Sequence, residues 1–293
     1  MSQKKFSLLV LPAVKGTLEV VQKFPFEIHF TKGTYRDIAF VFHKKTVTVF
    51  HRGIDLRSFS FVWLSSNWET RDLAYAVHLY LISVKTPHSY VEEGSSKITD
   101  CMFFGLHNLP MPDTVFVNRS QILKNLSLIK DVCGYPLIIK DIKGAQGKYS
   151  EFVTSELELL EKISLLPKDR KFLFQRYIPN EYDWGIMMAN GEVVAGEKSY
   201  PLDGEFRNNS CNGAKEHFIE ISAIPRKIKE IALATNNLLG LSWCRVDIIV
   251  DKKTNLPYLL EINRFPGITS ASNEVLGAYT FLASHIFPNK KKI

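Results

Sequence analysis

The chain has few cysteines, and they lie far apart. Cys101, Cys133, Cys211 and Cys244 form no C-x-x-C pair. This spacing argues against a zinc-binding frame and against the disulfide scaffold of a small secreted protein. We therefore expect the protein to work in a reducing, cytoplasmic setting.

Long hydrophobic runs, internal repeats and biased tracts are also missing. No apolar stretch approaches the ~20 residues that a membrane helix needs, so we expect no membrane span. The apolar run after Lys5 is interrupted at Pro12 and Lys15 without a small-residue cleavage pattern, which is not the pattern of a signal peptide. What remains is 293 residues, 45% hydrophobic and 23% charged, typical of a globular protein with two or three lobes.

The net charge of +7 is spread along the chain, and only Lys290, Lys291 and Lys292 form a basic run. This charge favours anionic partners such as nucleotides or acidic peptides, although a solvated basic surface explains most of it. A nucleic-acid binder would need a stacking surface. The aromatic residues at 50, 59, 61 and 63 are better explained as the core of a sheet, so we do not expect nucleic acid as a partner.

Residues 1–94 have the pattern of a small α/β domain. A helix is predicted from about 69 to 84, behind Asn67 as its N-cap and before Pro87. Short β-type runs separated by turn residues are predicted at 6–11, 17–21, 26–30, 38–42, 46–50 and 59–64.

Downstream, a glycine loop joins two predicted strands. The strand 135–140 ends in Lys140 and is followed by K-G-A-Q-G-K at 143–148, after which β-structure resumes at about 151. Glycines let backbone N–H groups turn toward an anion, and lysines neutralise phosphate charge. Because no helix follows, the loop is not a P-loop. Taken alone, it could equally be a plain turn.

A second motif lies in the predicted hairpin of strands 246–250 and 258–262. Asp247 lies in the first strand, and Glu261 and Asn263 lie two residues apart in the second, on one face of a regular strand. Carboxylate and amide oxygens suit Mg²⁺ or Mn²⁺, with substrate phosphates completing the coordination. Solvated acidic residues at a hairpin end are the alternative that these positions leave open.

The order of these motifs resembles the ATP-grasp superfamily, and within it the RimK-like amino-acid and peptide ligases. It runs from the glycine loop through Q-R-Y-I-P at 175–179, G-E-F-R-N-N at 204–209 and R-V-D at 245–247 to E-I-N-R-F-P-G at 261–267. The resemblance implies an α/β (α+β) fold of two lobes sandwiching ATP, at 95–177 and 178–293, preceded by a smaller substrate-side domain at 1–94.

The resemblance also implies roles for individual residues. The residues implied to bind ATP are Lys97 and Lys140 at the phosphates, Gly144, Gln146 and Gly147 in the closing loop, Gln175, Arg176, Tyr177 and Ile178 at the adenine, and Asp183 near the nucleotide. Lys198, Arg207 and Asn209 are implied to act around the transferred phosphate, and Asp247, Glu261 and Asn263 to bind the metal. Two departures are Tyr149, where relatives commonly have a further glycine, and Gly185, where relatives often have arginine.

The implied activity is ATP-dependent ligation of a carboxylate and an amine through an acyl phosphate. The substrate would be an amino acid or a peptide, bound near the first domain and the loops around Arg207 and Arg264. Three alternatives stay open: a macrocyclase that joins both groups of one peptide, a non-catalytic ATP-binding regulator, and the nucleic-acid binder. The resemblance also leaves open a homo-oligomer.

Overall fold

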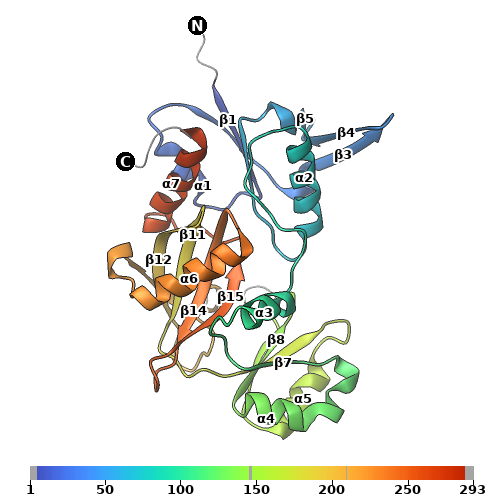
Figure 1. Ribbon diagram of the computed structural model, residues 1–293, viewed down its shortest axis with the longest axis vertical. Helices are drawn as coiled ribbons and strands as arrows, with labels where there is room; N and C mark the ends of the chain where they lie inside the picture. Colours follow the sequence, from blue (N-terminus) through green and yellow to red (C-terminus); the bar gives the residue numbers. More distant parts are fainter. Residues whose placement is uncertain (1–4, 145–146, 209, 288–293) are drawn as a thin grey trace.

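The computed structural model describes residues 5–144, 147–208 and 210–287. Within these ranges the chain forms four β-sheets with α-helices around them, arranged as three parts along the long axis of the molecule (Figure 1). No helix in the described part of the chain is long and apolar enough to span a bilayer. The sheets fall within the predicted ranges 1–94, 95–177 and 178–293, while the boundaries themselves stay predictions.

The N-terminal part contains a parallel sheet of order β2-β1-β6 and a separate antiparallel sheet β3-β4-β5. Its elements are β1 (Phe6–Leu11), α1 (Thr17–Gln22), β2 (Ile28–Lys32), β3 (Ile38–His43), β4 (Thr46–His51), β5 (Ile54–Asp55), β6 (Phe61–Leu64) and α2 (Arg71–Ser83). The prediction of a strand at 17–21 is wrong. Because β1 and β2 are parallel, the chain between them must cross over, and Thr17, Val20 and Val21 are buried at helical spacing in α1.

The second part is an antiparallel sheet of order β7-β10-β8-β9. Its elements are β7 (Thr114–Phe116), α4 (Leu126–Cys133), β8 (Leu137–Asp141), β9 (Ser150–Val153), α5 (Glu156–Leu165) and β10 (Phe172–Arg176). Ile129 of α4 and Leu159 of α5 pack with Ile139 and Phe174 in a core of its own. The helices cover one face of the sheet, which leaves the opposite face available to the next lobe.

Helix α3 (Lys97–Leu106) precedes this sheet in sequence but packs elsewhere. Ser96 caps its N-terminus in a reciprocal capping box with Thr99. Phe104 is buried in the core of the C-terminal sheet. The position of Lys97 is therefore fixed by the C-terminal lobe.

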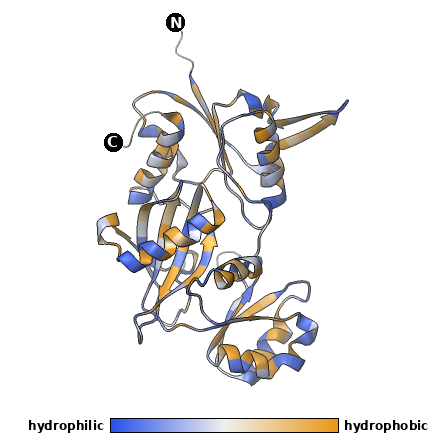
Figure 2. Cartoon of the chain, viewed as in Figure 1, coloured by the Kyte–Doolittle hydropathy of each residue, from blue (hydrophilic) through white to orange (hydrophobic). Residues whose placement is uncertain are grey.

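The third part is a five-stranded antiparallel sheet of order β13-β12-β11-β14-β15. Its elements are β11 (Asp183–Ala189), β12 (Glu192–Tyr200), β13 (Lys215–Ile219), α6 (Arg226–Leu239), β14 (Trp243–Val250), β15 (Pro257–Asn263) and α7 (Asn273–Ile286). Asn190 and Gly191 both have positive φ, as the tight hairpin between β11 and β12 requires. Helix α6 carries both hydrophilic and hydrophobic residues (Figure 2) and buries Ile228 and Ile231 against one face of the sheet.

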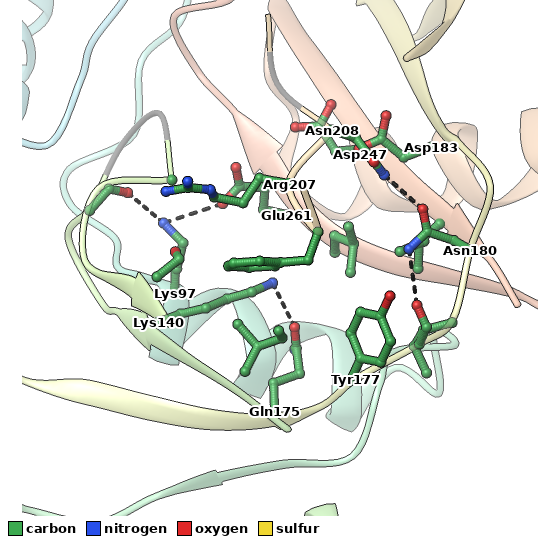
Figure 3. A pocket seen from close by; sticks show the side chains of 18 of the residues that line it. Lys97, Lys140, Gln175, Tyr177, Asn180, Asp183, Arg207, Asn208, Asp247 and Glu261 are labelled. Atoms are coloured by element: carbon green, nitrogen blue, oxygen red, sulfur yellow. Dashed lines mark hydrogen bonds and ion pairs between the residues drawn. The ribbon is translucent and has the colours of Figure 1, made fainter. Parts of the chain in front are cut away.

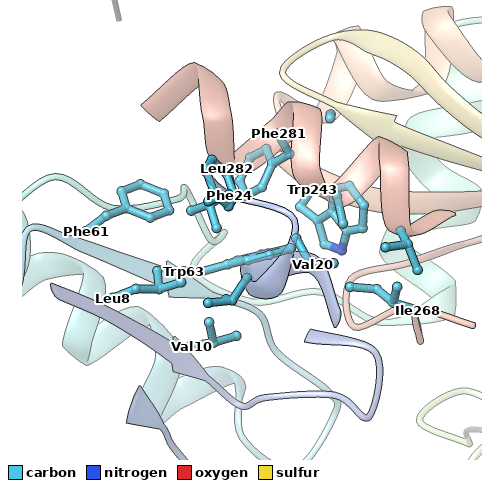
Figure 4. Packing of buried hydrophobic residues seen from close by; sticks show 14 of the residues in the cluster. Leu8, Val10, Val20, Phe24, Phe61, Trp63, Trp243, Ile268, Phe281 and Leu282 are labelled. Carbon is cyan, nitrogen blue, oxygen red and sulfur yellow. The ribbon is translucent and has the colours of Figure 1, made fainter. Parts of the chain in front are cut away.

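The other face of this sheet is shared between two neighbours. At one end Met187 of β11 belongs to a core that joins α7 to the N-terminal sheet through Trp63, Trp243 and Phe281 (Figure 4). At the other end, Asp183 of the same strand faces the sheet β7-β10-β8-β9 across a pocket. The N-terminal part and the C-terminal lobe therefore share one core, and the pocket lies between that unit and the separately packed second part.

Candidate active site

The pocket collects charged side chains from both lobes. Among the described residues that line it, six are basic (Lys97, Lys140, Lys148, Arg176, Arg207, Arg245) and four are acidic (Asp141, Asp183, Asp247, Glu261). Figure 3 shows Lys97 and Lys140 at one end and Tyr177 and Asn180 at the other. The pocket thus has one strongly charged end.

Two lysines define the charged end. Lys97, in the first turn of α3, donates to the Gly144 carbonyl oxygen at 2.6 Å and lies 3.2 Å from Glu261 Oε2. Lys140, near the end of β8, donates to Gln175 Oε1 at 2.7 Å. Burial lowers the pKa of Lys140, because a desolvated ammonium is costly without an anion. The predicted phosphate-binding lysines are therefore brought together from two lobes.

Asp247 and Glu261 face each other across the β14–β15 ladder. Burial raises the pKa of Asp247 to about 6 against the opposing effect of Arg245. Burial also acts to raise the pKa of Glu261, but the Lys97 and Lys140 charges outweigh it and hold that pKa below its ordinary value. A bulge in this ladder lets Leu260 and Glu261, although adjacent in sequence, both line the pocket.

The residues present fit a hard divalent cation. Two facing carboxylates supply the oxygen ligands that Mg²⁺ prefers, and phosphate oxygens can supply more. Asn263 lies two residues further along β15, opposite Arg245, but its Oδ1 accepts the N–H of Phe265 at 2.9 Å and it does not line the pocket. Its metal-binding role stays a prediction.

The opposite end of the pocket carries most of its apolar side chains. Ile138, Tyr177 and Ile178 line it from the β8 and β10 side, with Ile249 and Leu260 from the C-terminal sheet. The predicted residues Gln175, Arg176, Tyr177 and Ile178 all line the pocket. Arg176 also reaches outward to Asp113, 3.1 Å away.

Asp183 lies near Asn180 and Asn208, on the side of the pocket away from Lys97 and Lys140 (Figure 3). Its Oδ1 is buried without a hydrogen-bond partner, and burial, together with the Asp247 charge, raises its pKa well above the usual range. Nearby, Asn208 donates to Asn180 Oδ1 at 2.9 Å, and the Asn208 Oδ1 is also buried without a partner. An orphaned acceptor aimed at a pocket is the mark of a group that meets a ligand.

Arg207 lines the pocket but is held by a neighbour. Its Nε and one terminal nitrogen donate to the Glu205 carboxylate at 2.9 Å and 2.7 Å. This bidentate pair raises the pKa of Arg207. Gly144 and Gly147 line the pocket as well, whereas the predicted site residues Gln146 and Asn209 lie outside the described residues.

Lys198 does not line the pocket, and its role near the transferred phosphate stays a prediction. In β12 it pairs with Trp184, whose side chain packs on the α6 face of the sheet. Its Nζ lies 4.0 Å from the centre of the Tyr182 ring and 4.9 Å from that of Trp184. Strand alternation puts Glu197, not Lys198, on the pocket side.

The side chain of Arg264 is turned into the protein, and the expectation that the surrounding loop helps to bind the substrate stays a prediction. Arg264 is 4% exposed, and its guanidinium binds Asp100 in a bidentate pair at 2.7 and 2.8 Å, with Glu92 as a further partner. All of these groups belong to the packing between parts of the molecule. Arg264 is therefore held as a structural cation and is not presented to a substrate.

Tyr149, one of the two departures, has a positive φ of 57°, a conformation that glycine adopts more readily. Arg170 lies over its ring at 4.6 Å and pairs with Asp141. The tyrosine therefore ties the end of the glycine loop to the body of the second part, between β8 and β10.

Sequence reasoning missed several polar residues of this region, among them Asp141 and Ser150 of the pocket lining. Asn180, Asn208 and Arg245 line the pocket, and the buried Glu197 pairs with Arg245 at 2.5 Å. A signal was available for Arg245, since it lies two residues before Asp247 on the same strand face. The others depend on how distant strands pair.

Together, the two lobes around a pocket of lysines and facing carboxylates have the architecture of an ATP-grasp ligase. The fold is shared with the D-Ala:D-Ser ligase VanG of Enterococcus faecalis, at a TM-score of 0.71 and 16% identity over 97% of this chain and 99% of that one. It is also shared with the ATP-grasp ligase PsnB, solved with a minimal precursor, at a TM-score of 0.64 and 15% identity over 96% and 99% of the two chains.

The chain belongs to the RimK-like ATP-grasp domain family, whose model matches residues 97–278. A relative in sequence is a probable alpha-L-glutamate ligase of Saccharophagus degradans, 28% identical over 69% of this chain and 67% of that protein. For other curated relatives the match covers as little as 37% of their own length. Family and fold are thus established independently of the pocket's chemistry.

Proposed function

We propose that this protein is an ATP-dependent carboxylate–amine ligase that forms an amide bond through an acyl phosphate. The observation that carries the proposal is the pair Asp247 and Glu261, set opposite Lys97 and Lys140 beside the glycine loop. Carboxylates that bind a cation, next to lysines that bind phosphate, are the groups that phosphoryl transfer from ATP needs.

The shape of the pocket suggests how ATP would lie. The base would occupy the apolar end near Tyr177, Ile178 and Leu260, and the phosphates would extend toward Lys97 and Lys140. In this orientation Lys97 exchanges its contact with the Gly144 carbonyl for a phosphate oxygen. Asp183, with its unpartnered oxygen, would accept from the nucleotide.

Asp247 and Glu261 would hold Mg²⁺ or Mn²⁺, with Asn263 proposed as a further ligand after a local rearrangement. A divalent cation held there would offset the negative charge of the phosphate groups. Lys140 and Arg207 would offset the remaining charge as two anions approach each other.

The proposed reaction has two steps. A carboxylate oxygen of the first substrate attacks the γ-phosphorus of ATP, and the bond to the ADP oxygen breaks. The amine of the second substrate then attacks the acyl carbon of the acyl phosphate, and phosphate leaves while the amine loses a proton. The pocket contributes positioning and charge stabilisation, and we assign no residue as general base.

The proposed substrate class is an amino acid or a peptide. Two observations support it: a relative in sequence named as a probable glutamate ligase, and a shared fold with a ligase solved together with a precursor. The net charge of +7 favours an acidic substrate, which would be attracted electrostatically.

The first experiment measures ADP and phosphate release from Mg–ATP with pooled amino acids and short peptides. It compares the intact protein with Glu261→Gln, and uses Glu230→Gln, on the exposed side of α6, as a matched control. We expect substrate-stimulated release that Glu261→Gln loses and Glu230→Gln keeps. Splitting the active pool would then identify the substrate, and mass spectrometry would separate a linear product from a macrocycle.

A failure to turn over would be resolved by nucleotide binding. Binding of Mg–ATP without release under any substrate pool favours the regulatory alternative. Absence of Mg–ATP binding by the intact, folded protein would refute the proposed function.

A further inference from the structure

In the C-terminal sheet, the Arg245 side chain fills the space where a side chain on Gly185 would lie. Gly185 lies in β11 opposite Asp247 in β14, and Arg245 precedes Asp247 by two residues. A Cβ atom added to Gly185 would lie 2.4 Å from Nε and 2.5 Å from Cζ of Arg245. Because Gly185 does not have a positive φ, its backbone conformation would accept other residues, but a larger residue there would have to displace the Arg245 guanidinium.

The guanidinium that rests on Gly185 is bonded to two carboxylates. Nε donates to Asp247 Oδ1 at 2.7 Å, and a terminal nitrogen lies 2.5 Å from Glu197 Oε1. Glu197 is 1% exposed, so it can act as a fixed anchor. Arg245 thereby fixes one oxygen of Asp247 and leaves the rest of that carboxylate to the pocket that both residues line.

We propose that Arg245, seated on the bare backbone of Gly185 and anchored by Glu197, is the positioning residue that orients Asp247 toward the metal and the nucleotide phosphates. The inference rests on the proposed function and deepens it. It also accounts for the departure at position 185, because the cation absent from β11 is supplied by the neighbouring strand. An arginine at 185 and an arginine at 245 would compete for the same space.

A double-mutant cycle tests the coupling. Gly185→Ala drives a methyl group into the guanidinium, and Arg245→Ala removes the guanidinium. Each single variant is expected to weaken Mg²⁺-dependent ATP binding, measured by calorimetry, by about tenfold or more, as loss of a partner to a metal ligand does. In the Arg245→Ala background, Gly185→Ala is expected to add less than about twofold, because the contact it disturbs is already gone.

Further measurements separate positioning from general damage. Circular dichroism and thermal unfolding check that each variant is folded. Arg245→Lys serves as a milder variant, because lysine keeps the positive charge but lacks the several N–H donors with which the guanidinium binds Asp247 and Glu197. Binding of ADP without divalent cation is expected to change less than binding with Mg²⁺ in every variant. The exchange Gly185→Arg with Arg245→Gly is expected to regain binding that both single changes lose.

The outcomes separate a failure of the positioning role of Arg245 from a failure of the proposed ligase function. Additive losses in the cycle, or Gly185→Ala binding Mg–ATP as the intact protein does, overturn the role of Arg245 alone. Equal losses with and without Mg²⁺ also overturn it. An intact protein that binds no Mg–ATP overturns the proposed function first, and this inference with it.

Discussion

Replacing Arg264 by methionine should destabilise the whole molecule. Arg264 follows β15, while its partners Asp100 and Glu92 belong to α3 and to the segment that leaves the N-terminal part. Arg71 of α2 lies 3.6 Å from Glu92. One guanidinium therefore holds together segments from different parts of the structure.

The size of the effect follows from burial. Asp100 is 2% exposed and Arg264 is 4% exposed, so the variant leaves a buried carboxylate without its cation. Removing one partner of a buried ion pair costs about 3–5 kcal/mol. For a chain of this size that corresponds to a decrease in Tm of roughly 10 °C.

The effect should depend on pH. Burial acts to raise the pKa of Glu92, but Arg264 outweighs burial and holds that pKa below its ordinary value. The pairing of Glu92 with Arg264 therefore stabilises the fold above the ordinary pKa of the carboxyl. This stabilisation is lost as pH falls through the lowered pKa of the folded state. Without Arg264 the buried carboxylates bind protons more readily. The difference in stability between the two proteins should therefore shrink as pH falls from neutral to below about 4.5, the ordinary pKa of a glutamate carboxyl.

Denaturant unfolding at several pH values provides the assay. The matched control is Arg226→Met, which removes an exposed i,i+4 pair with Glu230 on α6 and should cost less than about 1 kcal/mol. If Arg264→Met is as stable as Arg226→Met, or if its deficit grows as the solution is acidified, the assignment of Arg264 to a structural ion cluster is refuted.

Two further predictions use matched or self-contained comparisons. Lys140→Met should weaken ATP binding by about tenfold or more, because charge-assisted hydrogen bonds contribute about 1.5–3 kcal/mol. The matched variant Lys198→Met should bind ATP nearly as the intact protein does. Equal losses of affinity in calorimetry would show that Lys198 also reaches the nucleotide. Burial lowers the pKa of His285 to about 4, so the folded state holds this side chain neutral and the free energy of unfolding should fall as pH drops from about 6.5 toward 4. The variant His285→Phe keeps the stacking on Phe61, and its stability should depend less on pH. An unchanged pH profile of unfolding would contradict this prediction.

Most helices and strands could be predicted correctly because their sequence patterns involve residues close together in the chain. The helix predicted from about 69 to 84 is α2, and the strands predicted at 6–11 and 46–50 are β1 and β4, because each pattern reflects chemistry within a few residues. The segment 17–21 was misassigned because its valines suit a strand as well as a short helix. The parallel pairing of β1 with β2 decides between them, and that pairing is not local.

The pocket shows the same division between local and distant information. Asp247 and Glu261 could be paired from the sequence because a short turn joins their strands. The face of Lys198 could not be assigned, since it depends on which side of β12 packs on α6. Nor could the seat of Arg245 on Gly185, which requires the register of two strands about sixty residues apart in the chain.

The way the parts are held together explains how this pocket can admit a nucleotide. The N-terminal part and the C-terminal lobe share an apolar core through Trp63 and Trp243, and α3 joins that unit through Phe104. The second part has its own core, and across the pocket Lys97 reaches it by two hydrogen bonds, from its side chain to the Gly144 carbonyl and from its backbone N–H to the Ile142 carbonyl. A hydrogen bond of this kind contributes only about 0.5–1.5 kcal/mol net, far less than a shared core. Phosphate oxygens can replace the Gly144 carbonyl as the acceptor, so binding at Lys97 exchanges one contact for a stronger one while the apolar cores stay intact.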